Sequence, residues 1–106
     1  MTRITAASVE VRHTFSSHRE DVDEILRRYD AGNPRLFGSV ARGDARRDSD
    51  IDLMVDLVPG RGNELLRLSG LAEELSSLLG RRVDVVSESL LRDEVSLTAR
   101  QDAVPV

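Results

Sequence analysis

Two stretches of the chain carry apolar residues at the spacing of an amphipathic helix. In the first stretch these positions are Val22, Ile25, Leu26 and Tyr29. Ser17 and Glu20 precede them in a capping-box pattern, and Gly32 stands where such a helix would end. The pattern therefore predicts a helix over about residues 17–30.

The second stretch begins after Pro59-Gly60-Arg61-Gly62, a segment that breaks the preceding pattern. Asn63 is a candidate N-cap, and Gly80 is placed to end the helix. The apolar positions between them are Leu65, Leu68, Leu71, Ala72, Leu75, Leu78 and Leu79. Because they form a stripe along one side of a helix, we expect this stripe to pack in the core rather than against a partner.

Residues 51–58 show the period of a strand instead. The odd positions Ile51, Leu53, Val55 and Leu57 are all apolar, whereas the even positions include Asp52 and Asp56. Since successive side chains of a strand point to opposite faces, one face of this strand is buried and the other carries carboxylates. The segment 82–86 repeats the pattern, with Asp84 on the face opposite its valine neighbours.

Three other segments complete the pattern. A short strand is predicted over residues 35–37, after an Asn33-Pro34 turn, and a final helix over about 90–102, before a Val104-Pro105-Val106 tail. The alternation from Val9 to Phe15 resembles a strand, whereas the residues before it resemble a mobile arm, so the conformation of residues 1–16 stays open. The order of elements predicts an α/β (α+β) domain, in which helices cover one face of a small mixed sheet.

The amino-acid composition argues against several classes of function. The chain has 106 residues, which fits one domain, and its net charge of −4 does not support a general electrostatic grip on nucleic acid or on an anionic membrane. Only three residues are aromatic, so the chain has few side chains on which the bases of a single-stranded nucleic acid could stack. The absence of cysteine, of a signal sequence and of a long apolar run leads us to expect a soluble, cytoplasmic protein.

Candidate chemistry lies in the carboxylates of the two longer strands. Asp50 and Asp52 share one strand face with Cα atoms about 6.5 Å apart, so they offer hard oxygen ligands to a divalent cation such as Mg²⁺. Asp84 is the natural third carboxylate if its strand lies beside theirs. Three carboxylates on neighbouring strands could hold two metal ions about 4 Å apart, an arrangement that suits nucleotidyl or phosphoryl transfer.

The loop before these carboxylates supplies a candidate phosphate site. Gly38 lets the backbone approach a phosphate closely, and the hydroxyl of Ser39 can donate to its oxygens. Arg42 adds a positive charge to the same loop, although it could instead pair with Asp44. Residues 38–52 together read GSVARGDARRDSDID, and Ser49 is expected to contact nucleotide with the other three.

The same positions allow interpretations without catalysis. An Asp-x-Asp pair is often a solvated strand edge, and Asp48 and Asp56 are expected to be surface or supporting groups. A calcium loop that started at Asp48 would need Gly and Glu where the chain has Leu53 and Pro59, so it is excluded. Both histidines, His13 and His18, are expected to be exposed polar residues.

Residues 37–57, FGSVARGDARRDSDIDLMVDL, resemble the signature of minimal nucleotidyltransferases of the DNA polymerase β superfamily, in particular MntA-type antitoxins paired with HEPN ribonuclease toxins. The resemblance spans residues 17–106 and leaves residues 1–16 outside as an N-terminal arm. It implies that Asp50 and Asp52 bind both metals and that Asp84 is a ligand that activates the acceptor hydroxyl. It also implies ATP as the donor, and an AMP transferred to a hydroxyl of the toxin, typically a tyrosine.

Three functions stay open at this point. The first is a protein adenylyltransferase that silences a HEPN-type toxin in a hetero-oligomer. The second is an antitoxin whose site is vestigial and which acts by binding alone. The third is a small-molecule nucleotidyltransferase of the antibiotic-modifying kind, which would need a second substrate-binding domain or a homodimer. A chain of this size favours a protein acceptor, because such an acceptor brings its own binding surface.

Overall fold

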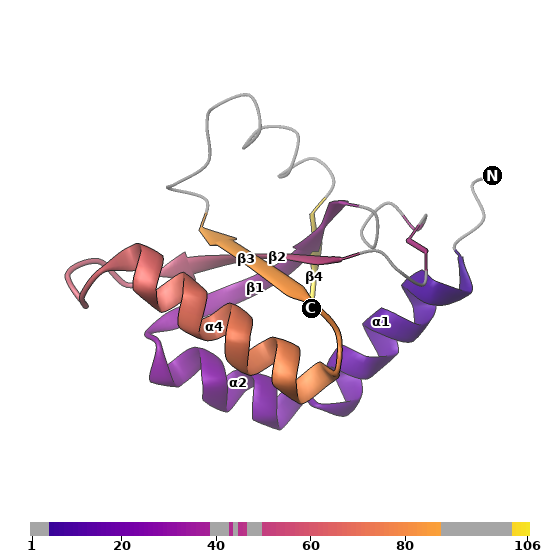
Figure 1. Cartoon of the computed structure of the whole chain (residues 1–106), viewed down its shortest axis with the longest axis horizontal. Helices are drawn as coiled ribbons and strands as arrows, with labels where there is room; N and C mark the ends of the chain where they lie inside the picture. The colour runs from indigo at the N-terminus through magenta and orange to yellow at the C-terminus, as the bar shows by residue number, and fades with distance from the viewer. Residues whose placement is uncertain (1–4, 39–42, 44, 47–49, 88–102) are drawn as a thin grey trace.

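A computed structural model of the chain describes residues 5–38, 43, 45–46, 50–87 and 103–106. Its elements follow in the order α1 (Ala6–Ser17), α2 (Arg19–Arg28), β1 (Ala31–Phe37), β2 (Ile51–Leu57), α4 (Glu64–Leu79), β3 (Val83–Ser87) and β4 (Val104–Pro105) (Figure 1). The predicted helix over 90–102 lies outside the described residues. Within the described residues, no helix is both long and apolar enough to cross a membrane.

The four strands form one mixed sheet in the order β3-β2-β1-β4. β1 pairs antiparallel with β2 and with β4, whereas β2 and β3 are parallel, with α4 as the connection between them. The predicted fold class, a small mixed sheet with helices, is therefore confirmed.

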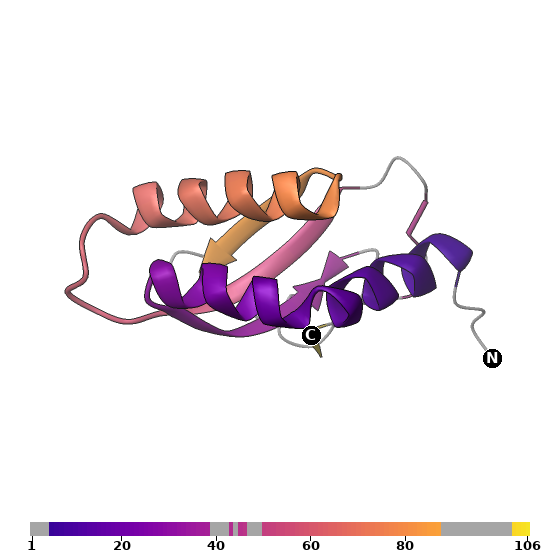
Figure 2. The ribbon, with the colours of Figure 1, turned by 90° about the horizontal axis from the view of Figure 1, so that it is seen from below.

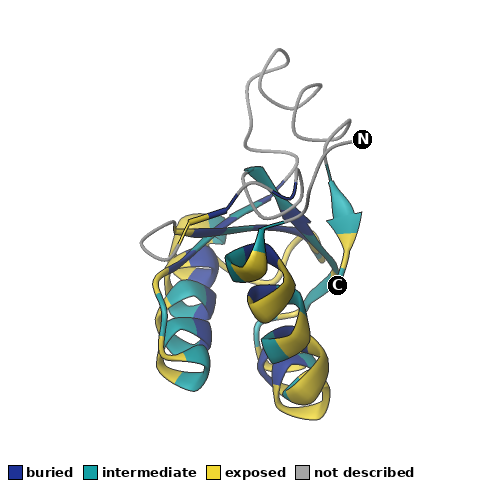
Figure 3. Ribbon diagram, turned by 90° about the vertical axis from the view of Figure 1, so that its right-hand side faces the viewer, coloured by how far each residue is buried: buried dark blue, intermediate teal, exposed yellow. Residues whose placement is uncertain are grey.

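The helices α1, α2 and α4 all lie on one side of the sheet, as the view from below shows (Figure 2). Seen edge-on, the buried surfaces of sheet and helices face each other (Figure 3). Ile51, Leu53 and Val55 of β2 point to this side and are at most 1% exposed. They pack with Val83 and Val85 of β3 in the core cluster. The alternation along both strands thus places their apolar positions toward the helices, and Asp52 and Asp84 toward the other face.

The first helices differ from the prediction. Residues 6–17 form α1, and its Val11 and Phe15 belong to the core, so this segment is neither a strand nor a mobile arm. Apolar residues four apart lie on one side of a helix, which fits Val11 and Phe15 better than the period of two does. The capping box is also wrong: Ser17 ends α1, and α2 follows His18, which makes no side-chain capping bond.

β1 begins earlier than predicted. Asp30, with a φ of 51°, ends the helical segment, and the strand runs from Ala31 through the Asn33-Pro34 pair that was expected to be a turn. Asn33 has a φ of 50°, and the register of β1 against β2 shifts between Gly32 and Arg35. The Asn33-Pro34 pair, which resembles a turn in the sequence, therefore lies in a β-bulge within the strand.

The predicted N-cap and C-cap of α4 are confirmed. Asn63 accepts a hydrogen bond from the Leu66 N–H at 3.0 Å, and Gly80 closes the helix with a φ of 68°. The predicted stripe is buried at Leu68, Leu71 and Leu75, but Leu65 at its start is 67% exposed. The assignment of Leu65 to the core is wrong, because this residue lies at the open groove between α4 and β3.

Contacts between α2 and α4 centre on Tyr29. Its ring lies so close to Gly70 that a Cβ at this position would come within 2.5 Å of the ring atom Cε1. A hydrogen bond to Glu74 raises the pKa of Tyr29. Glu74 also forms an ion pair with Arg28 at 2.8 Å. A glycine inside a helix costs about 1 kcal/mol relative to alanine, and here it makes room for the aromatic ring.

Arg67 ties three elements together. Its guanidinium donates to the backbone carbonyls of Tyr29 at 3.0 Å, Asp30 at 2.8 Å and Val58 at 3.0 Å. The residue is only 8% exposed, so these carbonyls are screened from water. A cation against the last carbonyls of a helix also complements the helix dipole. Arg67 therefore joins the start of α4 to the ends of α2 and β2.

We predict that Arg67→Met lowers the free energy of unfolding by about 2–4 kcal/mol, because it leaves buried carbonyl groups without donors. Urea denaturation measures the change. Arg61→Met is the matched control, since Arg61 is exposed on the preceding loop. A loss below about 0.5 kcal/mol in Arg67→Met, typical of surface positions, would contradict this role.

Candidate active site

Asp52 and Asp84 lie side by side on the open face of the sheet. They are partners in the parallel register of β2 and β3, in which Ile51 pairs with Val83 and Leu53 with Val85. Neighbouring strands are about 4.8 Å apart, so two carboxylates in one register row lie within reach of a common cation. Both residues are partly exposed. The sequence predicted this neighbourhood only on the assumption that the two strands are adjacent, and the structure shows that they are.

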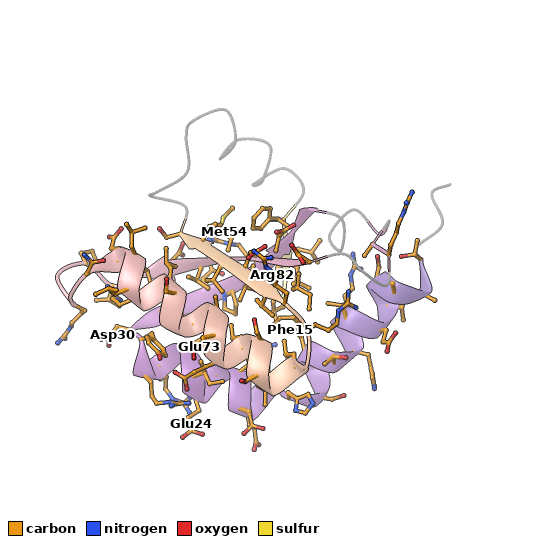
Figure 4. The ribbon with its side chains drawn as sticks, in the orientation of Figure 1. Phe15, Glu24, Asp30, Met54, Glu73 and Arg82 are labelled. Carbon is orange, nitrogen blue, oxygen red and sulfur yellow. The ribbon has the colours of Figure 1, made fainter. Side chains whose placement is uncertain are left out.

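Asp50 lies two residues before Asp52, on the same face. Its carboxylate faces the guanidinium of Arg82, with Arg82 Nε 3.9 Å from Asp50 Oδ2 and 3.4 Å from Asp84 Oδ1 (Figure 4 labels Arg82). Across the described stretches, no three acidic or histidine side chains converge closely enough to hold an ion as they stand. The predicted metal ligands therefore share one corner of the sheet, with a cation of the chain itself among them.

Gly38 follows the last residue of β1 and borders the same corner. Its φ is +69°, and a Cβ built at this position would overlap the carboxylate of Asp52 at Oδ2. Both observations require glycine: the backbone conformation disfavours a side chain, and the carboxylate occupies its space. Phe37 pairs with Asp52 across β1 and β2, so the end of β1 places Gly38 at this point.

The segment between β1 and β2 is anchored by the N-terminus of α1. The Thr5 hydroxyl donates to the Ala45 carbonyl at 2.7 Å, and the Ala45 N–H donates to Ser8 Oγ at 3.0 Å. The Thr5 N–H donates to the Gly43 carbonyl at 2.7 Å. Ser8 is fully buried, and Ala45 is 1% exposed. Residues outside the predicted domain thus hold the backbone at Gly43 and Ala45, between β1 and β2.

Farther along the open face, the sheet bears a second ion pair. Asp56 accepts from Arg35 at 3.0 Å and from the side-chain amide of Asn33 at 3.0 Å. Met54 lies between Asp52 and Asp56 along β2 and is fully buried, although it points away from the helix side (Figure 4). Asp56 is therefore engaged with β1 and stands apart from Asp50 and Asp84. Its side chain is 52% exposed, which fits the prediction of a surface group.

A groove of about 620 Å³ leads to this corner along the edge of the sheet. It lies between α4 and β3, and its walls are mostly apolar. The lining residues are Leu65, Leu68, Ser69, Ala72, Asp84, Val85 and Val86. Asp84 is the one acidic residue in this lining, so the groove connects an apolar surface to a predicted catalytic carboxylate.

The structure thus brings together Asp50, Asp52, Asp84 and Gly38. Ser39, Arg42 and Ser49, the other predicted nucleotide-binding residues, lie outside the described residues. Sequence reasoning missed Arg82. The strand period that selected Asp84 could have found it, because residues two apart on a strand share a face.

The fold recurs in solved structures. One, described as a minimal nucleotidyltransferase, aligns with a TM-score of 0.75 and 42% identity over 89% of this chain and 94% of its own. A toxin–antitoxin crystal structure with AMP-PNP has a TM-score of 0.67 over 81% of this chain and 69% of its own, and its 24% identity is a likeness of fold. The chain is therefore a small domain of the nucleotidyltransferase fold.

Similarity in sequence also assigns the chain to a protein family. The chain belongs to the nucleotidyltransferase domain family, whose model matches residues 16–104. It is also 34% identical over 99 residues to the protein adenylyltransferase MntA of Thermococcus cleftensis, which covers 92% of this chain and 93% of that protein. The chain is accordingly a nucleotidyltransferase, as the motif in residues 37–57 led us to expect.

We predict that Gly38→Ala lowers the nucleotidyl transfer rate about 100-fold, because a Cβ would displace the Asp52 carboxylate by the order of an ångström. The measurement is the rate at saturating nucleotide, with urea denaturation to check folding.

Gly60→Ala is the control for backbone strain alone. Its φ is +76°, and a Cβ there would meet nothing within 4 Å. Both variants should lose about 1–2 kcal/mol of stability from the left-handed backbone. Equal transfer rates in the two variants would show that the contact between Gly38 and Asp52 has no catalytic consequence.

Proposed function

We propose that this chain is a protein adenylyltransferase that transfers AMP from ATP to a hydroxyl group, a tyrosine in the first instance, of a toxin and thereby acts as an antitoxin. The observation that carries the proposal is the pairing of Asp52 with Asp84 across parallel strands, beside Asp50 and Gly38. The proposal is also supported by the 34% identity, over nearly the whole chain, to a protein named for this activity.

The residues at this corner fit Mg²⁺. Carboxylate oxygens are the ligands that Mg²⁺ prefers, usually one or two of them together with substrate phosphates, and Asp50, Asp52 and Asp84 offer such oxygens on one face. We assign two Mg²⁺ ions to these three residues. When bound, the ions neutralise the charge of the triphosphate and lower the pKa of the attacking hydroxyl.

The chain's own groups complete the reaction. The missing Cβ of Gly38 leaves space for the Asp52 carboxylate. The Gly38 backbone, Ser39, Arg42 and Ser49 are proposed to contact the triphosphate. The acceptor oxygen attacks the α-phosphorus of ATP, and its proton passes to Asp84. The bond from the α-phosphorus to the bridging oxygen breaks, and pyrophosphate leaves with that electron pair.

The acceptor is proposed to be a HEPN-type ribonuclease toxin bound in a hetero-oligomer. The groove between α4 and β3 supports a protein acceptor, since its apolar walls lead directly to Asp84. Leu65 and Leu66 are 67% and 72% exposed at the start of α4, close to the mouth of this groove. Exposed apolar side chains beside a catalytic carboxylate suit a partner that brings its own apolar surface.

The test is intact-mass spectrometry of the partner protein after incubation with this chain, Mg²⁺ and each nucleoside triphosphate in turn. We expect a nucleoside-monophosphate adduct with ATP. Asp50→Asn, Asp52→Asn and Asp84→Asn should each lower its rate of formation at least about 100-fold, because each removes a charge that holds the metal.

Asp56→Asn is the matched control. Asp56 lies on the same face of the same strand as Asp52, but it pairs with Arg35. This variant should retain the wild-type rate within about threefold, as expected for a group that touches neither metal nor substrate. If no adduct forms and the three Asn variants still bind and neutralise the toxin, the carboxylates are vestigial and the chain acts by binding alone.

A further inference from the structure

Arg82 places a positive charge among the predicted metal ligands. Its Nε lies 3.4 Å from Asp84 Oδ1 and 3.9 Å from Asp50 Oδ2. The side chain is 74% exposed, and those of Asp50 and Asp84 are 47% and 44% exposed. The three groups therefore meet at the surface, where a cation from solution can reach the same carboxylates.

The backbone fixes this placement. The Arg82 carbonyl accepts the Ile51 N–H at 2.9 Å, which extends the pairing of β2 and β3 by one step. In this register Arg82 stands beside Asp50, and it shares a face with Asp84 because the two are two residues apart. Arg81 is directed elsewhere, toward the Arg46 carbonyl at 3.5 Å. Only the second of these consecutive arginines faces the site.

We propose that Arg82 is a positioning residue that holds the carboxylates of Asp50 and Asp84 together in the metal-free site and competes with the metal for them. The inference rests on the proposed function, since it requires these carboxylates to be metal ligands. Three carboxylates at one corner repel each other, and the guanidinium offsets part of that repulsion. A divalent ion carries twice its charge and displaces it, because an exposed ion pair is weak.

The proposal has a measurable consequence for metal affinity in the absence of nucleotide. Wild-type protein must separate Arg82 from its partners and then tolerate its positive charge beside the ion. Arg82→Gln removes both costs, so it should bind Mn²⁺, used in place of Mg²⁺, about three- to tenfold more tightly at low ionic strength. Arg82→Lys keeps the charge and should stay close to the wild-type affinity.

The experiment is a titration of the nucleotide-free chain with Mn²⁺, in which electron paramagnetic resonance measures the free ion. Arg81→Gln is the matched control, because it changes the net charge equally one residue away and does not touch Asp50 or Asp84. Asp52→Asn identifies binding at the proposed site, since it removes a ligand and leaves the Arg82 contacts in place. Thermal unfolding confirms that each variant is folded.

The proposal is supported if Arg82→Gln binds more tightly while Arg81→Gln and Arg82→Lys match the wild type. It is overturned if Arg82→Gln and wild type bind alike and Asp52→Asn abolishes binding in both, a result that leaves the proposed metal site intact. Equal gains in Arg82→Gln and Arg81→Gln also overturn it, since they would reflect net charge alone. If Asp52→Asn binds as wild type does, the metal site fails, and the role of Arg82 fails with it.

Discussion

The parallel pairing of β2 with β3 is the constraint on which the site depends. A shift of one residue would turn Asp84 toward the helices and place a valine on the open face, since successive side chains of a strand alternate. The register is fixed by burial: Ile51, Leu53 and Val83 must face the helices to leave water. The apolar side of the sheet therefore sets the geometry of the polar side.

Two anchors outside the group of carboxylates keep this arrangement in place. Arg67 joins α4, the connection between the parallel strands, to the ends of α2 and β2. At the opposite end of the molecule, Thr5 and Ser8 hold the backbone at Ala45, within the segment that leads from Gly38 to β2. Both anchors use side-chain hydrogen bonds to backbone groups, which fix position without adding charge to the open face.

The sequence predicted the secondary structure correctly where a single hydrophobic period, that of a helix or of a strand, dominated a segment. Alternation along β2 and the caps of α4 predicted both elements, and the motif identified the carboxylates before their neighbourhood was known. It failed where two signals competed: the alternation up to Phe15 concealed a helix, and Asn33-Pro34 resembled a turn but forms a bulge. The role of Arg67 could not be predicted, because it depends on three carbonyls that only tertiary structure brings together. The position of Arg82 beside Asp50 needed the strand register.

We propose that Asp50, Asp52 and Asp84 bind the catalytic metal at one corner of the sheet. Paramagnetic broadening of backbone amide signals by Mn²⁺, in the presence of a nonhydrolysable ATP analogue, tests it most directly, because the effect falls steeply with distance from the ion. Broadening is expected to be strongest at Gly38, at residues 50–52 and at residues 82–84, and weak along α1 and α2. Broadening centred on any other group of acidic residues would contradict it.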